Sequence, residues 1–257
     1  MKTQDEITAA EIFSEARTKI PSASKLGEMA LAEILGMNAG NKKYIKENFS
    51  ELVVSTQVLA YARYQEFEAK ASGDAIRKVF TPLLPANASA GDVFDLIGER
   101  FSILDRYFLS LTQSRRPRAG STFEAIVSTL FKELDYPYTS QPEVDGSRPD
   151  YVLPGIEWYK KYSGDCIIFT CKRTLRERWR QVITEGMTGQ SFFLATIDEG
   201  LSDAELSRMK DRRVIVVVPS ELKESRYPAA LNVISFEDFF LHHLDPAIVR
   251  WRAKGVI

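Results

Sequence analysis

The chain has 257 residues, which is enough for one large domain or two small ones. Its composition, 44% hydrophobic and 27% charged, is that of an ordinary globular protein. The net charge of −1 argues against a protein that coats nucleic acid through overall basicity, but it leaves room for a locally basic cleft.

No membrane or export signal is evident in the sequence. The polar and acidic start, MKTQDEITAAEIF, lacks the apolar centre of a signal peptide. No apolar stretch approaches the roughly 20 residues that cross a bilayer. We therefore expect a cytoplasmic protein without a membrane partner.

The first part of the chain is predicted to be helical. Apolar residues recur at helical spacing over 5–80, with a break at 36–41 and a longer helix over 50–70. Prolines and small residues predict a loop over 82–91. A further helix is expected over 92–111.

A different pattern follows a basic loop predicted at 114–118. Residues 121–134 form an amphipathic helix, and short apolar runs then alternate with helical stretches. This alternation is typical of an α/β fold whose sheet is covered on both faces. We expect a helical portion at 1–110 attached to an α/β core at 111–257. The predicted strands are 150–153, 165–171, 192–197, 213–218 and 232–235, and the later helices are 174–188, 202–210 and 236–244.

The two cysteines lie five positions apart in one strand-like run. Cys166 and Cys171 would therefore point to opposite faces of the sheet, which argues against a disulfide between them. We expect two buried core residues. The sequence has no cluster with zinc-ligand spacing.

Three residues have the chemistry to cut a phosphodiester. Asp150 stands at the start of a predicted strand, Lys172 ends another, and Glu185 follows on the next predicted helix. Asp150 and Glu185 can bind Mg²⁺, while Lys172 polarises the phosphate or orients the attacking water. Nucleases with the PD-(D/E)XK pattern carry an acid two positions before the lysine. That position is Thr170 here, and Glu185 is predicted to supply the missing carboxylate.

A dense basic cluster follows Lys172. Arginine can donate two hydrogen bonds to guanine and glutamate can accept one from cytosine, so Arg176, Glu177 and Arg178 can read neighbouring G·C pairs. Arg173 and Arg180 would contact phosphates. The alternative is a helix surface with ordinary ion pairs. Cations in the first turns of a helix oppose its dipole, which favours a polyanionic partner.

Residues 172–182, KRTLRERWRQV, resemble the catalytic and recognition segment of the type II restriction endonucleases typified by EcoRII, SsoII and PspGI. Arg118 to Glu124, RAGSTFE, resembles the start of the family's first catalytic helix, and Pro149-Asp150 aligns with its metal-binding aspartate. The resemblance implies a PD-(D/E)XK core with a mixed central sheet flanked by helices. It also gives Glu124 an accessory catalytic role, and it implies Mg²⁺-dependent cleavage 5′ of the first C in a CC/GG-core site, CCNGG or CCWGG.

The same resemblance implies further DNA contacts. Gln113 corresponds to a glutamine near the centre of the recognition site, and Arg115 and Arg118 are candidates for backbone contacts. Several relatives flip the central bases out of the duplex. Arg63 and Phe67, with Tyr64 as an alternative, are candidates for the pocket that holds a flipped base. The other interpretation is that these aromatic residues belong to the helix core.

The expected partner is double-stranded DNA, bound by a homodimer or a larger assembly. One alternative is a relative that cuts CCGG, with or without flanking bases, and flips none. A repair or junction nuclease of the same fold should lack the Arg-Glu-Arg reader. A non-catalytic DNA-binding protein would not need Asp150, Lys172 and Glu185 together.

Overall fold

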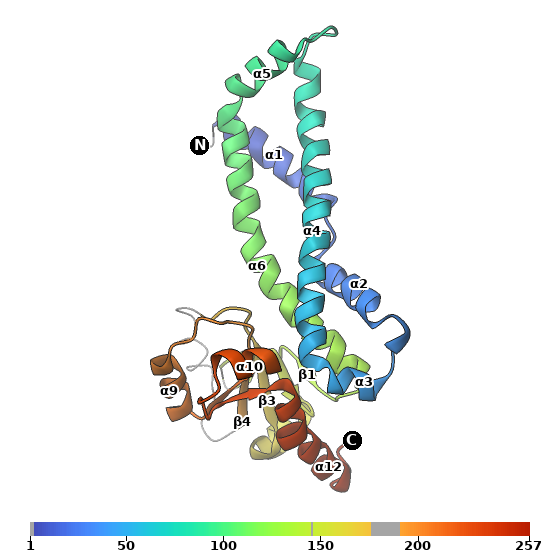
Figure 1. The fold of residues 1–257 in the computed structure, drawn as a ribbon, viewed down its shortest axis with the longest axis vertical. Helices are drawn as coiled ribbons and strands as arrows, with labels where there is room; N and C mark the ends of the chain where they lie inside the picture. Colours follow the sequence, from blue (N-terminus) through green and yellow to red (C-terminus); the bar gives the residue numbers. More distant parts are fainter. Residues whose placement is uncertain (1–2, 145, 176–190) are drawn as a thin grey trace.

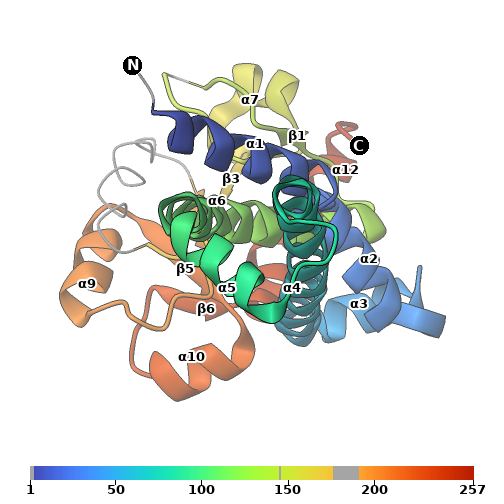
Figure 2. The same ribbon diagram turned by 90° about the horizontal axis from the view of Figure 1, so that it is seen from above.

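A long helical arm projects from a sheet-containing core (Figure 1). The computed structural model describes residues 3–144, 146–175 and 191–257. Helices α4 (Phe49–Phe80) and α6 (Phe101–Glu133) run in opposite directions along the arm, and Figure 2 looks down its length. The other helical elements of this part are α1 (Gln4–Thr18), α2 (Ala23–Leu35), η1 (Gly36–Asn38), α3 (Lys42–Glu47), η2 (Thr81–Leu83) and α5 (Ala90–Glu99).

Polar side chains set the helix starts, and an apolar cluster holds the arm together. Thr3 and Ser89 begin α1 and α5 with capping boxes, in which side chain and backbone satisfy each other's free N–H groups. α1 and α2 both pack against α4 and α6. The arm's buried residues include Ile12, Tyr64 and Tyr107, and their removal from water stabilises the helical packing.

Helix α6 passes straight through the predicted basic loop, so the expectation of a loop at 114–118 was wrong. Pro117 lies inside the helix. A proline there removes one helical hydrogen bond and strains the preceding turn. The neighbouring side chains offset this cost, because Arg115 is bound by Glu68 of α4 and Arg118 by the carbonyl of Pro21. The predicted boundary between 110 and 111 falls within this single helix.

Within the described residues the sheet has six strands in chain order, β1-β2-β3-β4-β5-β6. The first three pair antiparallel and the last four parallel, so the sheet is mixed, as expected. The strands are β1 (Thr139–Ser140), β2 (Tyr151–Leu153), β3 (Ile167–Cys171), β4 (Ser191–Ala195), β5 (Val214–Val218) and β6 (Val233–Ser235).

Two hydrophobic clusters cover the two faces of the sheet. Phe169 and Phe193 pack with Phe123 and Phe131 of α6 on one face, while the alternate strand positions pack on the other. Cys171 belongs to the first cluster and Cys166 to the second, and both thiols are free, as predicted.

Five of the strands were predicted within two or three residues of their ends, whereas the two-residue β1 was not. The helices α7 (Ile156–Tyr162), α10 (Ser220–Arg226) and α12 (Asp245–Ala253) were also missed. The other elements within the described residues are η3 (Ser163–Asp165), α9 (Asp203–Asp211), α11 (Phe236–Phe239) and the π-helical turn η5 (Phe240–Leu244). In the part that the structure describes, no helix is both long and apolar enough to cross a membrane.

Candidate active site

Asp150 and Lys172 meet where β2 begins and β3 ends. The two strands are antiparallel neighbours, with Tyr151 opposite Phe169, so the residue before β2 lies beside the residues that close β3. Lys172 Nζ is 3.5 Å from Asp150 Oδ2. The sheet register therefore brings together two residues that are 22 positions apart in the sequence.

The carboxylate of Asp150 is held in place by the backbone of β3. The N–H of Cys171 donates to Asp150 Oδ2 at 2.7 Å, and Asp150 is only 6% exposed. The N–H of Asp150 points to the hydroxyl of Thr170 at 3.5 Å. Thr170 is buried below the aspartate, so the position where the nuclease pattern carries an acid contributes a hydroxyl to the support of Asp150.

Glu124 reaches the same place from α6. The hydroxyl of Tyr151 donates to the backbone carbonyl of Glu124 at 3.0 Å, which ties the helix to β2. Burial, and then repulsion from Asp150, raises the pKa of the Glu124 carboxyl, whereas the hydrogen bond from Gln141 and the charge of Lys172 lower it. The three predicted residues Glu124, Asp150 and Lys172 thus share one electrostatic environment.

Gln141 is a member of this cluster that the sequence analysis missed. Its side-chain Nε2 donates to Glu124 Oε1 at 3.2 Å, and its backbone N–H donates to the carbonyl of Asp150 at 2.8 Å. Its φ of 48° lies in the left-handed region, which is unusual for a residue other than glycine. Its carbonyl accepts from Arg148 Nε at 3.0 Å. No sequence motif marks a glutamine after a two-residue strand, so the sequence carries no signal for this residue.

The donor set suits a hard divalent cation. Asp150 and Glu124 offer carboxylate oxygens, the ligands that Mg²⁺ prefers, and their mutual repulsion is what a cation between them would relieve. Among the described residues no group of three or more His, Cys, Asp or Glu is arranged to hold a metal. Glu185, the predicted third carboxylate, lies outside those residues, as do Arg176, Glu177, Arg178 and Arg180.

Residues 92–240 match the family model described as EcoRII C terminal, which is more than half of the chain. The chain belongs to this family of type II restriction endonucleases. It is 28% identical over 216 residues to the type II restriction enzyme SsoII of Shigella sonnei, covering 79% of this chain and 71% of SsoII. It is 29% identical over 148 residues to the type II restriction enzyme EcoRII of Escherichia coli, covering 54% of this chain and 36% of EcoRII. The resemblance expected from the sequence is confirmed.

Solved structures of restriction endonucleases share the fold. Metal-depleted Ecl18kI in complex with uncleaved DNA aligns with 98% of this chain and 86% of its own, at a TM-score of 0.80 and 25% identity. The PspGI–substrate DNA complex aligns with 91% of this chain and 94% of its own, at a TM-score of 0.64 and 19% identity. The core is therefore of the restriction-endonuclease PD-(D/E)XK type, as predicted.

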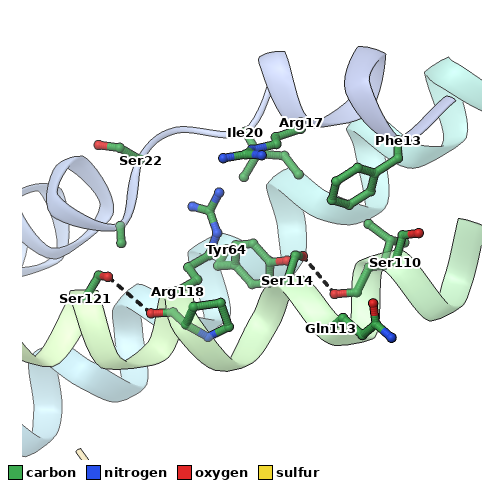
Figure 3. A pocket seen from close by; sticks show the side chains of 13 residues that line it. Phe13, Arg17, Ile20, Ser22, Tyr64, Ser110, Gln113, Ser114, Arg118 and Ser121 are labelled. Atoms are coloured by element: carbon green, nitrogen blue, oxygen red, sulfur yellow. Dashed lines mark hydrogen bonds between the residues drawn. The ribbon is translucent and has the colours of Figure 1, made fainter. Parts of the chain in front are cut away.

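A cavity of about 740 Å³ lies along the arm, between α1, α4 and α6 (Figure 3). Gln113, Tyr64 and Arg118 are among its lining residues. The guanidinium of Arg118 lies 4.9 Å from the centre of the Tyr64 ring, a distance that suits a cation–π interaction, and its Nη1 donates to the carbonyl of Pro21 at 2.6 Å. An aromatic face, a guanidinium and an amide thus border one space.

Arg63 and Phe67, the first candidates for a flipped-base pocket, do not line this cavity. The guanidinium of Arg63 pairs with Glu33 at 3.1 Å and with Glu66 at 3.2 Å. Phe67 packs against the apolar cluster of the arm. Tyr64, the alternative candidate, is buried against the cavity wall.

The two other basic candidates within the described residues have different surroundings. Arg115 donates from Nη2 and Nε to the buried carboxylate of Glu68, at 2.5 Å and 3.2 Å, and its side chain remains 44% exposed. Arg173 follows Lys172 directly, and its carbonyl accepts from the Thr196 hydroxyl at 3.2 Å. The Nε of Arg173 is buried, with no hydrogen-bond partner among the described residues.

Proposed function

We propose that the chain is a Mg²⁺-dependent enzyme that cuts double-stranded DNA at a palindromic CC/GG-core site. The supporting observation is the cluster of Glu124, Asp150 and Lys172, held by the ends of two strands and one helix. Relatives with the same fold are described as DNA complexes, which supports DNA as the substrate.

The residues divide the chemistry among them. Lys172 offers a positive charge next to Asp150, where it stabilises negative charge that develops on a phosphate and orients the attacking water. Asp150 is the first metal ligand, because the Cys171 N–H fixes its carboxylate before any ligand binds. Glu185 is the proposed second ligand, and Glu124 is the accessory carboxylate. Mg²⁺ bound there supplies charge neutralisation and an acidified water.

A plasmid-cleavage assay with Mg²⁺ tests this function. Asp150→Asn keeps the size of the side chain but removes its charge, so we expect cleavage to fall at least 100-fold. Asp211→Asn, at an exposed aspartate that ends α9, is the matched control and should cut normally. A wild-type protein that binds DNA but leaves the plasmid intact under these conditions would overturn the proposal.

The proposed recognition site rests on the basic and acidic side chains of residues 176–178. Arg176, Glu177 and Arg178 supply two donor side chains and one acceptor side chain for the C·G pairs. The DNA backbone is contacted by Arg115, Arg118, Arg173 and Arg180. CCNGG or CCWGG, cut 5′ of the first C, is the leading site and CCGG is the alternative. Sequencing the ends of cut DNA distinguishes them, because only the five-base-pair sites leave an additional central base in the overhang.

A central base, if flipped, is proposed to enter the cavity at Tyr64. The Arg118 guanidinium covers the Tyr64 ring there and offers a stacking surface of its own, and Gln113 is another lining residue. A 2-aminopurine placed at the centre of the site should gain fluorescence on binding, and Tyr64→Leu should reduce the gain. If the fluorescence gain is unchanged in Tyr64→Leu but lost in Phe67→Leu, the flipped base is held by Arg63 and Phe67 instead.

The enzyme is proposed to act as a homodimer in the cytoplasm. A palindromic site has two equivalent strands to cut, and one chain supplies one cluster of catalytic residues. In this proposal the helical portion at 1–110 takes part in DNA contact and dimerisation, and the core at 111–257 carries catalysis and recognition.

A further inference from the structure

The loop that follows β4 runs beside the residues that follow β3. The two strands are parallel neighbours, so the chain leaves both of them at the same edge of the sheet (Figure 1). The N–H of Lys172 donates to the carbonyl of Ala195 at 2.9 Å, which extends the strand pairing one residue beyond β3. Lys172 therefore shares this edge of the sheet with the loop 196–200.

Two side chains of this loop bind the backbone of the residues that follow Lys172. The hydroxyl of Thr196 donates to the carbonyl of Arg173 at 3.2 Å, and Oδ2 of Asp198 accepts from the N–H of Leu175 at 2.7 Å. The Thr196 hydroxyl also accepts from the N–H of Asp198 at 3.1 Å, so the two contacts belong to one network. Thr196 is fully buried, and the hydrogen bonds of a buried hydroxyl are costly to lose.

Leu175 is fixed by its side chain as well as by its backbone. The side chain is fully buried in the cluster on one face of the sheet, with residues of β4 and β5. Asp198 is held in turn, because its Oδ1 accepts from the N–H of Gly200 at 2.9 Å and its carbonyl accepts from the hydroxyl of Tyr227 at 2.7 Å. The place of the Leu175 N–H is therefore set by a carboxylate that is oriented before any ligand binds.

The place of Leu175 matters because the proposed base-reading residues 176–178 come next in the sequence. The chain from Lys172 to Leu175 could span up to about 10 Å if it were extended and free. A displacement of about 1 Å is already enough to weaken a contact that depends on exact geometry. The hydrogen bonds from Thr196 and Asp198 remove this freedom between Lys172 and Leu175.

We propose that Thr196 and Asp198 are positioning residues for sequence recognition. They hold Arg173 and Leu175 so that residues 176–178 begin at a fixed place relative to Lys172. The inference rests on the proposed function, in which residues 176–178 read base pairs and Lys172 acts at the cut phosphate. It adds a loop outside that segment, whose two side chains act through the backbone of the chain and need not touch the DNA.

The test is a gel-shift titration of the full chain without metal. The probes are duplexes that carry CCAGG or CCGG, and the same duplexes with the first C·G pair replaced by T·A. The discrimination ratio is the Kd for the substituted duplex divided by the Kd for its parent, taken for the parent that wild type binds more tightly. Inactive protein affects both constants equally, so a variant that is merely less stable keeps the wild-type ratio.

Asp198→Ala and Thr196→Val should lower this ratio by roughly 10-fold, within the roughly 5- to 140-fold that the loss of one bidentate base contact costs. Asp198→Asn keeps an oxygen that can accept from the Leu175 N–H, and should retain most of the ratio. Glu199→Ala, at the exposed neighbour of Asp198, is the matched control and should behave like wild type. A wild type that prefers neither parent duplex, or an Asp198→Ala variant with the wild-type ratio, would overturn the proposal.

A second measurement follows the contact itself. Hydrogen–deuterium exchange of the Leu175 amide should be faster in Asp198→Ala than in wild type, and unchanged in Glu199→Ala. Wild-type exchange of this amide in Asp198→Ala would reject the anchoring role of the carboxylate. Neither readout involves cleavage, so a chain that discriminates through Asp198 but never cuts plasmid would refute the proposed function and leave this inference standing. A chain that cuts plasmid, and discriminates equally well as Asp198→Ala, would refute this inference alone.

Discussion

The side-chain amide of Gln141 lies 3.2 Å from the carboxylate of Glu124, and the backbone of the same glutamine is hydrogen-bonded to Asp150. One residue therefore contacts both acidic residues, Glu124 through its side chain and Asp150 through its backbone. The contact also favours the charged form of Glu124, because an amide N–H stabilises an ionised carboxylate in a half-buried position.

Replacing Gln141 with leucine should lower the single-turnover cleavage rate by roughly 10- to 100-fold, the usual effect of losing a residue that orients a metal ligand. DNA affinity measured without metal should stay the same, because the leucine leaves the basic residues in place. Gln65→Leu, at an exposed position of α4, is the control. A Gln141→Leu enzyme with the wild-type rate would show that Glu124 is positioned by other contacts.

Lys172→Met should abolish cleavage while largely preserving specific binding. The methionine keeps the length of the side chain but leaves the phosphate and Asp150 without the positive charge 3.5 Å away. Gel-shift and cleavage assays on one duplex separate the two effects, and Lys161→Met, at an exposed lysine of α7, is the comparison. Cleavage that persists in Lys172→Met would refute the role assigned to this lysine.

Glu68→Gln should lower the free energy of unfolding by about 2 kcal/mol, because hydrogen bonds to charged groups are worth roughly 1.5–3 kcal/mol. The buried carboxylate accepts from Arg115 and from the hydroxyl of Tyr64, and so joins α4 to α6. Glu66→Gln, two positions away in an exposed pair with Arg63, should change stability by no more than about 0.5 kcal/mol. Urea denaturation of both variants checks the difference, and equal effects would contradict it.

Asp165→Asn should make the fold less sensitive to acid. Burial raises the pKa of Asp165, but hydrogen bonds from Lys254, Trp158 and Arg250 outweigh it and lower the pKa below the usual value. A lowered carboxyl pKa stabilises the fold above the unfolded value of about 3.9, and this stability is lost as pH falls through the folded value.

The variant should therefore lose about 1–2 kcal/mol at pH 7 and progressively less below pH ~4. Thermal unfolding across that range, with Asp211→Asn as control, measures it. A constant difference from wild type at every pH would contradict the pKa argument.

The sequence predicted the strands and the Asp150–Lys172 pair because both leave short-range signals. Buried parallel strands are uninterrupted apolar runs such as Val214–Val218, and the acid and lysine stand at the ends of such runs. Gln141 leaves no such signal, since its role comes from a backbone hydrogen bond to Asp150, nine positions further on. Pro117 gave a misleading signal, because local propensity favours a break that the contacts of Arg115 and Arg118 override.

Helix α6 also has a mechanical consequence. Phe101 begins the helix at the far end of the arm. Glu124, near Asp150, belongs to the same helix and lies about 35 Å away at 1.5 Å per residue. Pro117, where one hydrogen bond of the helix is missing, lies between them, seven positions before Glu124. A tilt of only 5° about that point would move Glu124 by roughly 1 Å, since seven residues of helix separate the two. The stiffness of α6 therefore limits how accurately the carboxylate of Glu124 can be placed.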